Sequence, residues 1–350
     1  MSSTALEPKK PAPKANYAPL VSVIMPAFNT AHLIGPSLDS VLAQTYQNVE
    51  IIVVNDGSPD TPELEAVLAP YQERIIYVRQ ENKRAAGARN TAIARSQGEL
   101  LAFLDSDDLW FADHLSSQVK LFEANPDLDL VYSDCFAWAD PGSQETFMQA
   151  CPSQGEAGFD ALVEERCQIP VSTVVARKRI IEKAGPFDEN LIRCDDYDMW
   201  LRVAFHGGKI GYSRTVQARL SQGRPDSLGL ANAKMLEADW IILEKLLRSL
   251  PLSEEERKFV RKRADQLRGQ YLLEEAKLQL ESGNFRDARN LLAEANVHLQ
   301  RFVLSLTQLS LGLAPNTAGK LIIFARRVRQ QARSCGQTPK RTAEKPKMAA

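Results

Sequence analysis

Short runs of strand-forming residues alternate with helical patterns from Leu20 to Ser221. Residues 21–28 and 49–58 are the first two runs, and the second closes on a turn of Asn, Asp, Gly and Ser. Helical spacing of apolar residues follows each run, and two further runs repeat the order before residue 110. This alternation predicts an α/β fold with a mainly parallel sheet and flanking helices, because parallel neighbours need a crossover between them.

The sequence pattern changes after residue 229. Residues 230–333 show long helical periodicity with few strand signals, which predicts an all-helical C-terminal extension behind a domain of residues 20–229. Residues 1–19 have no apolar stretch of the kind a signal peptide requires, and we expect a disordered tail. Residues 334–350 are polar and basic with two prolines, which predicts a second disordered tail.

Charge and cysteine usage exclude several classes of function. The 43 Lys and Arg residues nearly balance the 44 Asp and Glu residues, so no global basic surface for nucleic acid is expected. The five cysteines form no C-x-x-C pair and indicate neither a zinc cage nor a disulfide framework. We therefore expect a cytoplasmic protein, in which any metal ion is held by oxygen ligands.

An acidic cluster, residues 105–108, directly follows a strongly apolar strand. The carboxyl ends of strands form the ligand crevice of open α/β sheets. Asp105 and Asp107 would repel each other there unless a cation joined them, and oxygen ligands favour Mg²⁺ or Mn²⁺ bridging to phosphates. The alternative is that Asp107 or Asp108 caps a helix beginning at Leu109.

The first two strands also end in side chains suited to a nucleotide. Asp56 closes the second strand and could accept a hydrogen bond from a base edge, although Asp-Gly is also ordinary turn chemistry. The first strand ends in Pro26, Phe28 and Asn29, which would place a ring and an amide where a nucleobase could rest. Phe28 could instead fill the core.

Gly87, Ala88, Arg89 and Asn90 open the helix that precedes the acidic strand. Small residues allow close approach, the helix N-terminus favours anions, and Arg89 would add a forked phosphate donor. The chain has no G-x-G-x-x-G and no Walker sequence, which argues against a dinucleotide-dependent dehydrogenase and a P-loop NTPase.

A second acidic cluster begins another helical segment. Asp195, Asp196 and Asp198 could simply complement the dipole at a helix N-terminus. The alternative is a general base, a carboxylate that takes the proton from an attacking hydroxyl.

Four ordered segments together resemble the family 2 glycosyltransferases of the A-type fold, over about Val21 to Ser227. They are VSVIMPAFN, VVNDGS, NKRAAGARNTAIARSQGELLAFLDSDD and CDDYDMWLRVA. The resemblance implies a Rossmann-like nucleotide half, about residues 20–110, joined to an acceptor half, about residues 111–229. It also implies inverting transfer of a sugar from a nucleoside diphosphate sugar, with a UDP-sugar favoured, to a hydroxyl of a glycan or lipid-linked glycan in cell-surface polysaccharide or glycoconjugate synthesis.

The resemblance assigns roles to individual residues. Asp196 matches the catalytic base, and Asp107, with Asp105, matches the ligands of Mg²⁺ or Mn²⁺. The residues that match nucleotide contacts are Pro26, Phe28, Asn29, Asp56, Arg89, Asn90 and Asp105.

One segment departs from the family pattern. Where members often carry Arg-x-His-x-x-Ser, Ser221 stands in place of the histidine. Arg219 or Arg224 could then pair with the diphosphate by charge.

Residues 302–319 contain no charged side chain, but their polar residues and Pro315 make them unsuited to span a membrane. An apolar stripe along this helix predicts packing within the protein or on a partner helix. The alternative is peripheral contact with the inner face of the membrane, which Lys320 and four arginines up to Arg333 would favour. The stripe comprises Leu299, Phe302, Leu306, Leu309 and Leu313.

Two other functions compete with this interpretation. A nucleotidyltransferase would need a basic residue in its first loop, and PAFNTAHLIG has none. A catalytically inactive scaffold acting through the helical C-terminal region is the other rival, and the intact acids Asp105, Asp107 and Asp196 argue against it.

Overall fold

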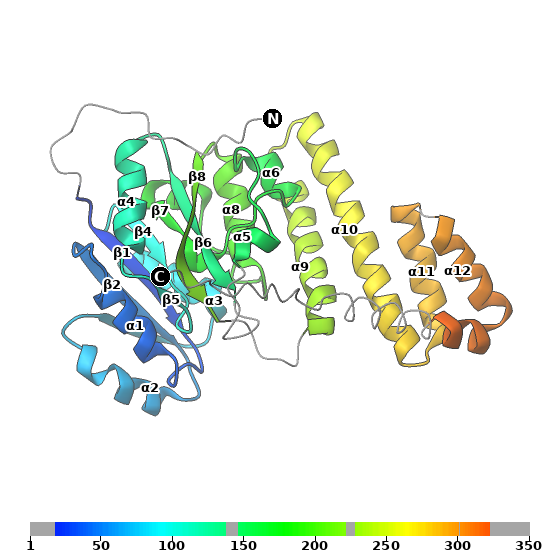
Figure 1. Cartoon of the computed structure of the whole chain (residues 1–350), viewed down its shortest axis with the longest axis horizontal. Coiled ribbons are helices and arrows are strands. Elements are labelled where there is room, and N and C mark those ends of the chain that lie inside the picture. Colours follow the sequence, from blue (N-terminus) through cyan, green and yellow to red (C-terminus); the bar gives the residue numbers. More distant parts are fainter. Residues whose placement is uncertain (1–17, 138–145, 222–227, 301, 323–350) are drawn as a thin grey trace, which may run out of the picture. The chain divides into compact units, whose positions relative to one another are not determined.

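The computed structural model describes residues 18–137, 146–221, 228–300 and 302–322 (Figure 1). The chain divides into two compact units. The first comprises the residues up to 228 together with residues 241–263, and the second comprises residues 229–240 together with the residues from 264 onward. Residues 1–17 and 334–350 of the predicted tails, and Arg224, lie outside the described residues.

The first unit is built on a mixed sheet, in which eight strands are described, in the order β3-β2-β1-β4-β7-β6-β8-β5. The first four strands run parallel to one another, as the alternation of the sequence predicts, and β7 then pairs antiparallel with β4. The α/β class is confirmed. The strand bounds are β1 Val21–Ala27, β2 Val49–Asp56, β3 Ile76–Gln80, β4 Leu100–Phe103, β5 Leu109–Trp110, β6 Leu130–Ala137, β7 Val175–Arg177 and β8 Ile210–Leu220.

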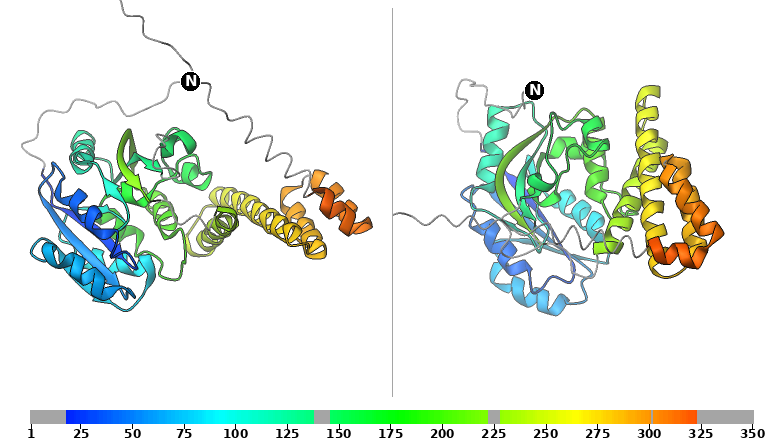
Figure 2. Two further views of the ribbon diagram at one scale, coloured as in Figure 1. Left: turned by 60° about the horizontal axis from the view of Figure 1, so that its bottom comes forward. Right: turned by 45° about the vertical axis from the view of Figure 1, so that its right-hand side comes forward.

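Helices cover both faces of this sheet (Figure 2). Helices α1 (Ile34–Leu42), α2 (Thr61–Leu68) and α4 (His114–Ala124) pack their apolar residues on one face and complete a single core cluster. Helix α3 (Arg84–Arg95) packs small residues against β1 and β2. The α-helices within residues 146–221 are α5 Phe147–Ala150, α6 Phe159–Val163, α7 Lys178–Ala184 and α8 Asp195–Phe205.

The parallel strands bring their carboxyl ends to one edge. The β1–β4 pairing ends at Ile24 and Phe103, so Pro26 lies beyond it and its missing N–H breaks no bond to β4. The residues after β1, β2 and β4 therefore meet at this edge. The capping alternative for Asp107 and Asp108 is wrong, because Leu109 begins β5 rather than a helix.

Helices alone make up the described chain from residue 228, as predicted. They are α9 Leu228–Ser249, α10 Glu254–Glu281, α11 Phe285–Leu299 and α12 Phe302–Leu313, and α12 ends before Pro315 as expected. The second unit has its own core, in which Leu280, Leu292 and Leu304 meet. None of the helices in the described ranges is long and apolar enough to cross a membrane.

Candidate active site

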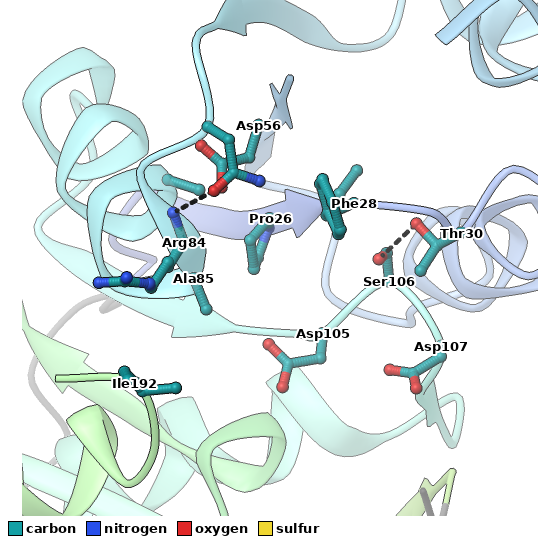
Figure 3. A pocket seen from close by; sticks show the side chains of 13 residues that line it. Pro26, Phe28, Thr30, Asp56, Arg84, Ala85, Asp105, Ser106, Asp107 and Ile192 are labelled. Carbon is teal, nitrogen blue, oxygen red and sulfur yellow. Dashed lines mark hydrogen bonds between the residues drawn. The ribbon is translucent and has the colours of Figure 1, made fainter. Parts of the chain in front are cut away.

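A cavity of about 500 Å³ opens at the carboxyl ends of β1, β2 and β4 (Figure 3). Five residues singled out in the sequence line this cavity although they come from three separate strands. They are Pro26, Phe28, Asp56, Asp105 and Asp107.

Asp56 presents an unused acceptor at this cavity. Its Oδ1 accepts hydrogen bonds from Gln80 Nε2 at 2.7 Å and from the Lys83 backbone N–H at 2.8 Å. Its Oδ2 is buried and has no hydrogen-bond partner among the described residues. Gly57 makes the turn behind it with φ of 65°, and an added Cβ would come within 2.8 Å of the Asn82 nitrogen. A ligand with an N–H group could satisfy Oδ2.

Phe28 and Asn29 have different surroundings. Phe28 is 49% exposed, so the alternative that it fills the core is wrong, and its ring forms part of the cavity wall. Asn29 adopts a left-handed conformation, and its backbone N–H donates a hydrogen bond to Ser58 Oγ at 2.6 Å. This hydrogen bond connects the loop after β1 to the turn after β2.

The first acidic cluster is crowded with negative charge. Burial and the neighbouring Asp105 raise the pKa of Asp107. Burial and both of these acids also raise the pKa of Asp108, which accepts a hydrogen bond from the Ser221 N–H at 2.6 Å. A cation among these carboxylates would relieve the repulsion.

The donor set fits Mg²⁺ or Mn²⁺ with a phosphate ligand. No group of three or more His, Cys, Asp or Glu residues in the described part of the chain is arranged to hold a metal ion. Asp105 and Asp107 would supply two oxygen ligands, and Mg²⁺ typically takes only one or two carboxylates and completes its shell with phosphate and water.

Arg89 and Asn90 lie behind the cavity and do not line it. The Arg89 side chain is 5% exposed, and its Nη2 and Nη1 contact Asp105 at 2.6 Å and Asp195 at 2.7 Å. Asn90 Nδ2 donates to the Phe187 carbonyl at 2.9 Å, and Asn90 Oδ1 accepts from the Phe187 N–H at 2.8 Å. The structure thus brings Arg89 to carboxylates of β4 and α8.

The second acidic cluster opens α8, and its three acids have different partners. Burial and the adjacent Asp195 raise the pKa of Asp196 to about 6, against the opposing charge of Arg89. A pKa near the working pH is what a general base needs. Asp198 is fully buried and pairs with Arg202 at 2.7 Å and with Lys245 at 2.8 Å, so it anchors the helix instead.

A second cavity of about 190 Å³ shares Asp107 with the first. Arg219 and Ser221 line it, which places both residues of the divergent segment beside the acidic cluster. The Ser221 side chain hydrogen-bonds Asp107, which partly offsets the rise in the pKa of that acid. The Arg219 guanidinium lies 5.5 Å from the centre of the Phe136 ring.

Arg84 and Ile192 are among the cavity residues that the sequence motifs do not indicate. Arg84 has a left-handed φ of 63°, and its Nη1 donates to the Glu189 carbonyl at 3.3 Å. A basic residue where a helix begins opposes the helix dipole, and that signal could have identified it. Ile192 is 76% exposed in the loop before α8, and no periodicity in the sequence distinguishes it.

Comparisons with known proteins point to one family. A family model for glycosyl transferase family 2 matches residues 22–142. An Escherichia coli protein named UDP-Glc:alpha-D-GlcNAc-diphosphoundecaprenol beta-1,3-glucosyltransferase WfgD is 34% identical over 185 residues, which cover 53% of this chain and 69% of that protein. An uncharacterized glycosyltransferase of Rickettsia felis is 31% identical over 198 residues, or 56% of this chain, but the chain spans only 33% of that longer relative.

A solved structure shares the fold. The mannosyltransferase PcManGT from Pyrobaculum calidifontis, in complex with GDP-Man and Mn²⁺, matches with a TM-score of 0.58 and 21% identity. The match covers 90% of this chain and 89% of that one. At this identity the likeness establishes the A-type glycosyltransferase architecture.

Proposed function

The chain belongs to glycosyltransferase family 2, and from this we propose that it transfers a sugar from a nucleoside diphosphate sugar to a hydroxyl acceptor with inversion of configuration. One observation carries the proposal: the cavity joins the unpartnered Oδ2 of Asp56 and the exposed ring of Phe28 to the acids Asp105 and Asp107. A base acceptor, a stacking surface and a site for the diphosphate are thus contiguous.

The nucleotide half of the donor occupies the side formed by β1 and β2. Asp56 Oδ2 accepts a hydrogen bond from an N–H on the base, and Phe28 packs against the base plane. A uracil offers such an imide N–H, which favours UDP, and the Escherichia coli relative is named for UDP-Glc. Pro26 and Asn29 shape the loop beneath the base.

The diphosphate lies over Asp105 and Asp107. Mg²⁺ or Mn²⁺ held by these two residues would neutralise charge on the leaving diphosphate. Arg219 lines the adjoining cavity beside Asp107, and we assign to it a charge contact with the diphosphate. Arg224 follows in the same segment and is proposed for the same role.

Asp196 is the proposed base. Its carboxylate takes the proton from the acceptor hydroxyl while that oxygen bonds to the anomeric carbon. The bond from the anomeric carbon to the diphosphate oxygen breaks in the same step, so a single displacement inverts the configuration. The pKa of about 6 leaves Asp196 deprotonated at neutral pH before the reaction, and the proton of the acceptor hydroxyl passes to it in this step.

The acceptor is proposed to be a glycan or lipid-linked glycan, as the name of the Escherichia coli relative suggests for that protein. A peripheral membrane contact would suit a lipid-linked acceptor, and α12 offers a surface for it. Leu309 is 61% and Leu313 79% exposed, although Leu304 and Leu311 of the same helix lie in the core. A cytoplasmic location at the inner face of the membrane is the matching proposal.

Calorimetry tests the donor site. UDP and GDP, each with and without Mn²⁺, are titrated into the wild type and into Asp107→Ala. We expect one nucleotide to bind in a metal-dependent manner and this binding to be lost in Asp107→Ala. Asp127→Ala serves as the matched control, because Asp127 is an exposed acid that pairs with Lys209 at 3.1 Å and does not line the cavity. If neither nucleotide binds the wild type, the scaffold function becomes the better proposal.

Vesicle sedimentation tests the membrane contact. The wild type should sediment together with vesicles of phosphatidylcholine and phosphatidylglycerol, and Leu309→Glu should stay in the supernatant. The side chain at position 309 is exposed, so a charge there should not disturb the core. Equal sedimentation of both proteins would remove α12 from the proposal.

A further inference from the structure

We propose that Arg89 is a positioning residue, which fixes Asp105 after β4 relative to the acids Asp195 and Asp196 of α8. In this proposal Arg89 is not a ligand of the donor phosphates. Its catalytic consequence rests on the proposed function, whereas the ion-pair arrangement itself does not.

Both terminal nitrogens of Arg89 pair with carboxylates. Nη2 pairs with Asp105 at 2.6 Å and Nη1 pairs with Asp195 at 2.7 Å. The third nitrogen, Nε, is buried, and the described residues offer it no acceptor. The guanidinium also lies 5.7 Å from the centre of the Phe187 ring. Both terminal nitrogens of Arg89 thus already face carboxylates, and the residue does not line the cavity where a donor phosphate would lie.

The next residue fastens the same two segments. Asn90 exchanges two hydrogen bonds with the backbone of Phe187 and donates a third, at 3.0 Å, to Glu189 Oε1. Gly87 is required at the start of α3 itself, because an added Cβ would lie 2.3 Å from Lys83 Cβ, whereas its 3.4 Å distance from Glu189 Cδ would be an ordinary contact. Helix α3 is thus attached to the loop that leads into α8 by both residues.

The charges explain why an arginine stands here. Burial opposes the charge of Arg89, but the nearby Asp105, Asp195 and Asp196 outweigh it and raise the pKa of the guanidinium, so it stays a cation. One planar fork can hold two carboxylates in fixed directions, whereas a lysine ammonium is a single point donor. Arg89 therefore fixes where Asp195 lies and, through the adjacent peptide, where Asp196 lies.

A stability cycle tests the ion-pair arrangement without reference to activity. Arg89→Gln should lower Tm by roughly 5 to 10 °C, because it leaves buried acids without their cation. Adding Asp195→Asn to Arg89→Gln should restore part of that loss. The control is Arg95→Gln, an exposed arginine on the same helix, which should leave Tm unchanged. Additive effects of the two substitutions would overturn the proposal.

Nucleotide binding and donor hydrolysis test the role in the reaction. UDP with Mn²⁺ is titrated into the wild type, Arg89→Lys and Arg89→Gln, and UDP release from UDP-glucose into water is followed between pH 5 and pH 9. We expect the UDP affinity to change less than about threefold, since no phosphate contact is lost, and kcat to fall at least about tenfold.

The pH profile separates positioning from a purely structural role. The groups acting on Asp196 are Asp195 and Asp105, which raise its pKa, and Arg89, which lowers it. Removing the arginine should therefore move the acidic limb of the profile upward by about one unit, and Arg89→Lys should restore part of the shift. A weakened UDP affinity with an unmoved limb would identify Arg89 as a phosphate ligand. If the wild type binds no nucleotide, the proposed function fails, while the stability cycle still decides the ion-pair arrangement.

Discussion

The two sides of the cavity are built in different ways. On the base side, Asp56 is positioned by the end of a strand and by two neutral donors, Gln80 Nε2 and the Lys83 N–H. On the reaction side, Asp105 and Asp196 depend on a charged arrangement around Arg89, whose acids come from segments about 90 residues apart. Backbone geometry therefore positions the side chains of the proposed nucleotide site, whereas charged contacts position those of the proposed catalytic site. Substitutions on the two sides should have different effects.

The largest effect is expected on the reaction side. Asp196→Asn should reduce transfer by about 10²- to 10⁴-fold, because proton removal by a positioned base contributes a factor of this size. UDP affinity, measured by calorimetry, should stay within about threefold of the wild type, since Asp196 does not line the base side. Unchanged transfer in this variant would remove Asp196 from the mechanism and break the comparison.

On the base side, Asp56→Asn should weaken UDP binding by about 10- to 100-fold, because an acceptor for a base N–H loses its charge and an amide N–H group can oppose that donor. The pH profile of hydrolysis should not move, since Asp56 accepts its hydrogen bonds from Gln80 and Lys83 and not from Arg89. Calorimetry and the profile together check both halves of this expectation. A moved profile with normal affinity would show that the two sides are not independent.

Phe28→Ala should have a smaller effect on affinity and almost none on stability. Loss of a stacking ring should weaken UDP binding by about 5- to 50-fold. Stability should change by less than about 0.5 kcal/mol, because Phe28 is half exposed. The matched substitution Phe103→Ala should cost about 3 to 5 kcal/mol, since Phe103 is buried between Phe187 and Trp200. Thermal unfolding and calorimetry distinguish the two phenylalanines, and equal loss of stability would contradict the exposed placement of Phe28.

The same contrast explains what could be predicted from sequence. Strand ends are visible as apolar runs that close on polar residues, so the fold class and the positions of Asp56, Asp105 and Asp107 at one edge follow from local patterns. The place of the Phe28 ring follows only from the three-dimensional structure, where it is half exposed, because an apolar residue at a strand end suits both a core and a cavity wall.

Side-chain pairs between residues that are distant in the sequence produce no comparable local pattern. The sequence gives no signal that Asp198 pairs with Lys245 while Asp196 is kept with a raised pKa, because both acids occupy the first turn of one helix. Arg89 looks like a phosphate donor when only its helix terminus is considered. Its partner Asp195 lies 106 positions away, and the exposed Ile192 comes from the same distant loop. The sequence allows a helix at Leu109, because the strand that pairs with this segment, β8, is likewise distant in the sequence.

The smallest effect concerns stability against pH. The pKa of Asp196 is raised from 3.8 to about 6 on folding, so between these values the folded protein holds a proton that the unfolded chain has released. This acid therefore lowers the free energy of unfolding as pH rises from about 4 to about 6, by about 1 to 2 kcal/mol for a partly buried group. Asp196→Asn lacks this dependence, and any change in packing from the amide is the same at both ends of the range. Urea unfolding at pH 4.5 and pH 7.5 should thus show Asp196→Asn gaining stability relative to the wild type at the higher pH. A difference that stays constant with pH would mean that burial and Asp195 do not raise the pKa of Asp196 in the folded protein.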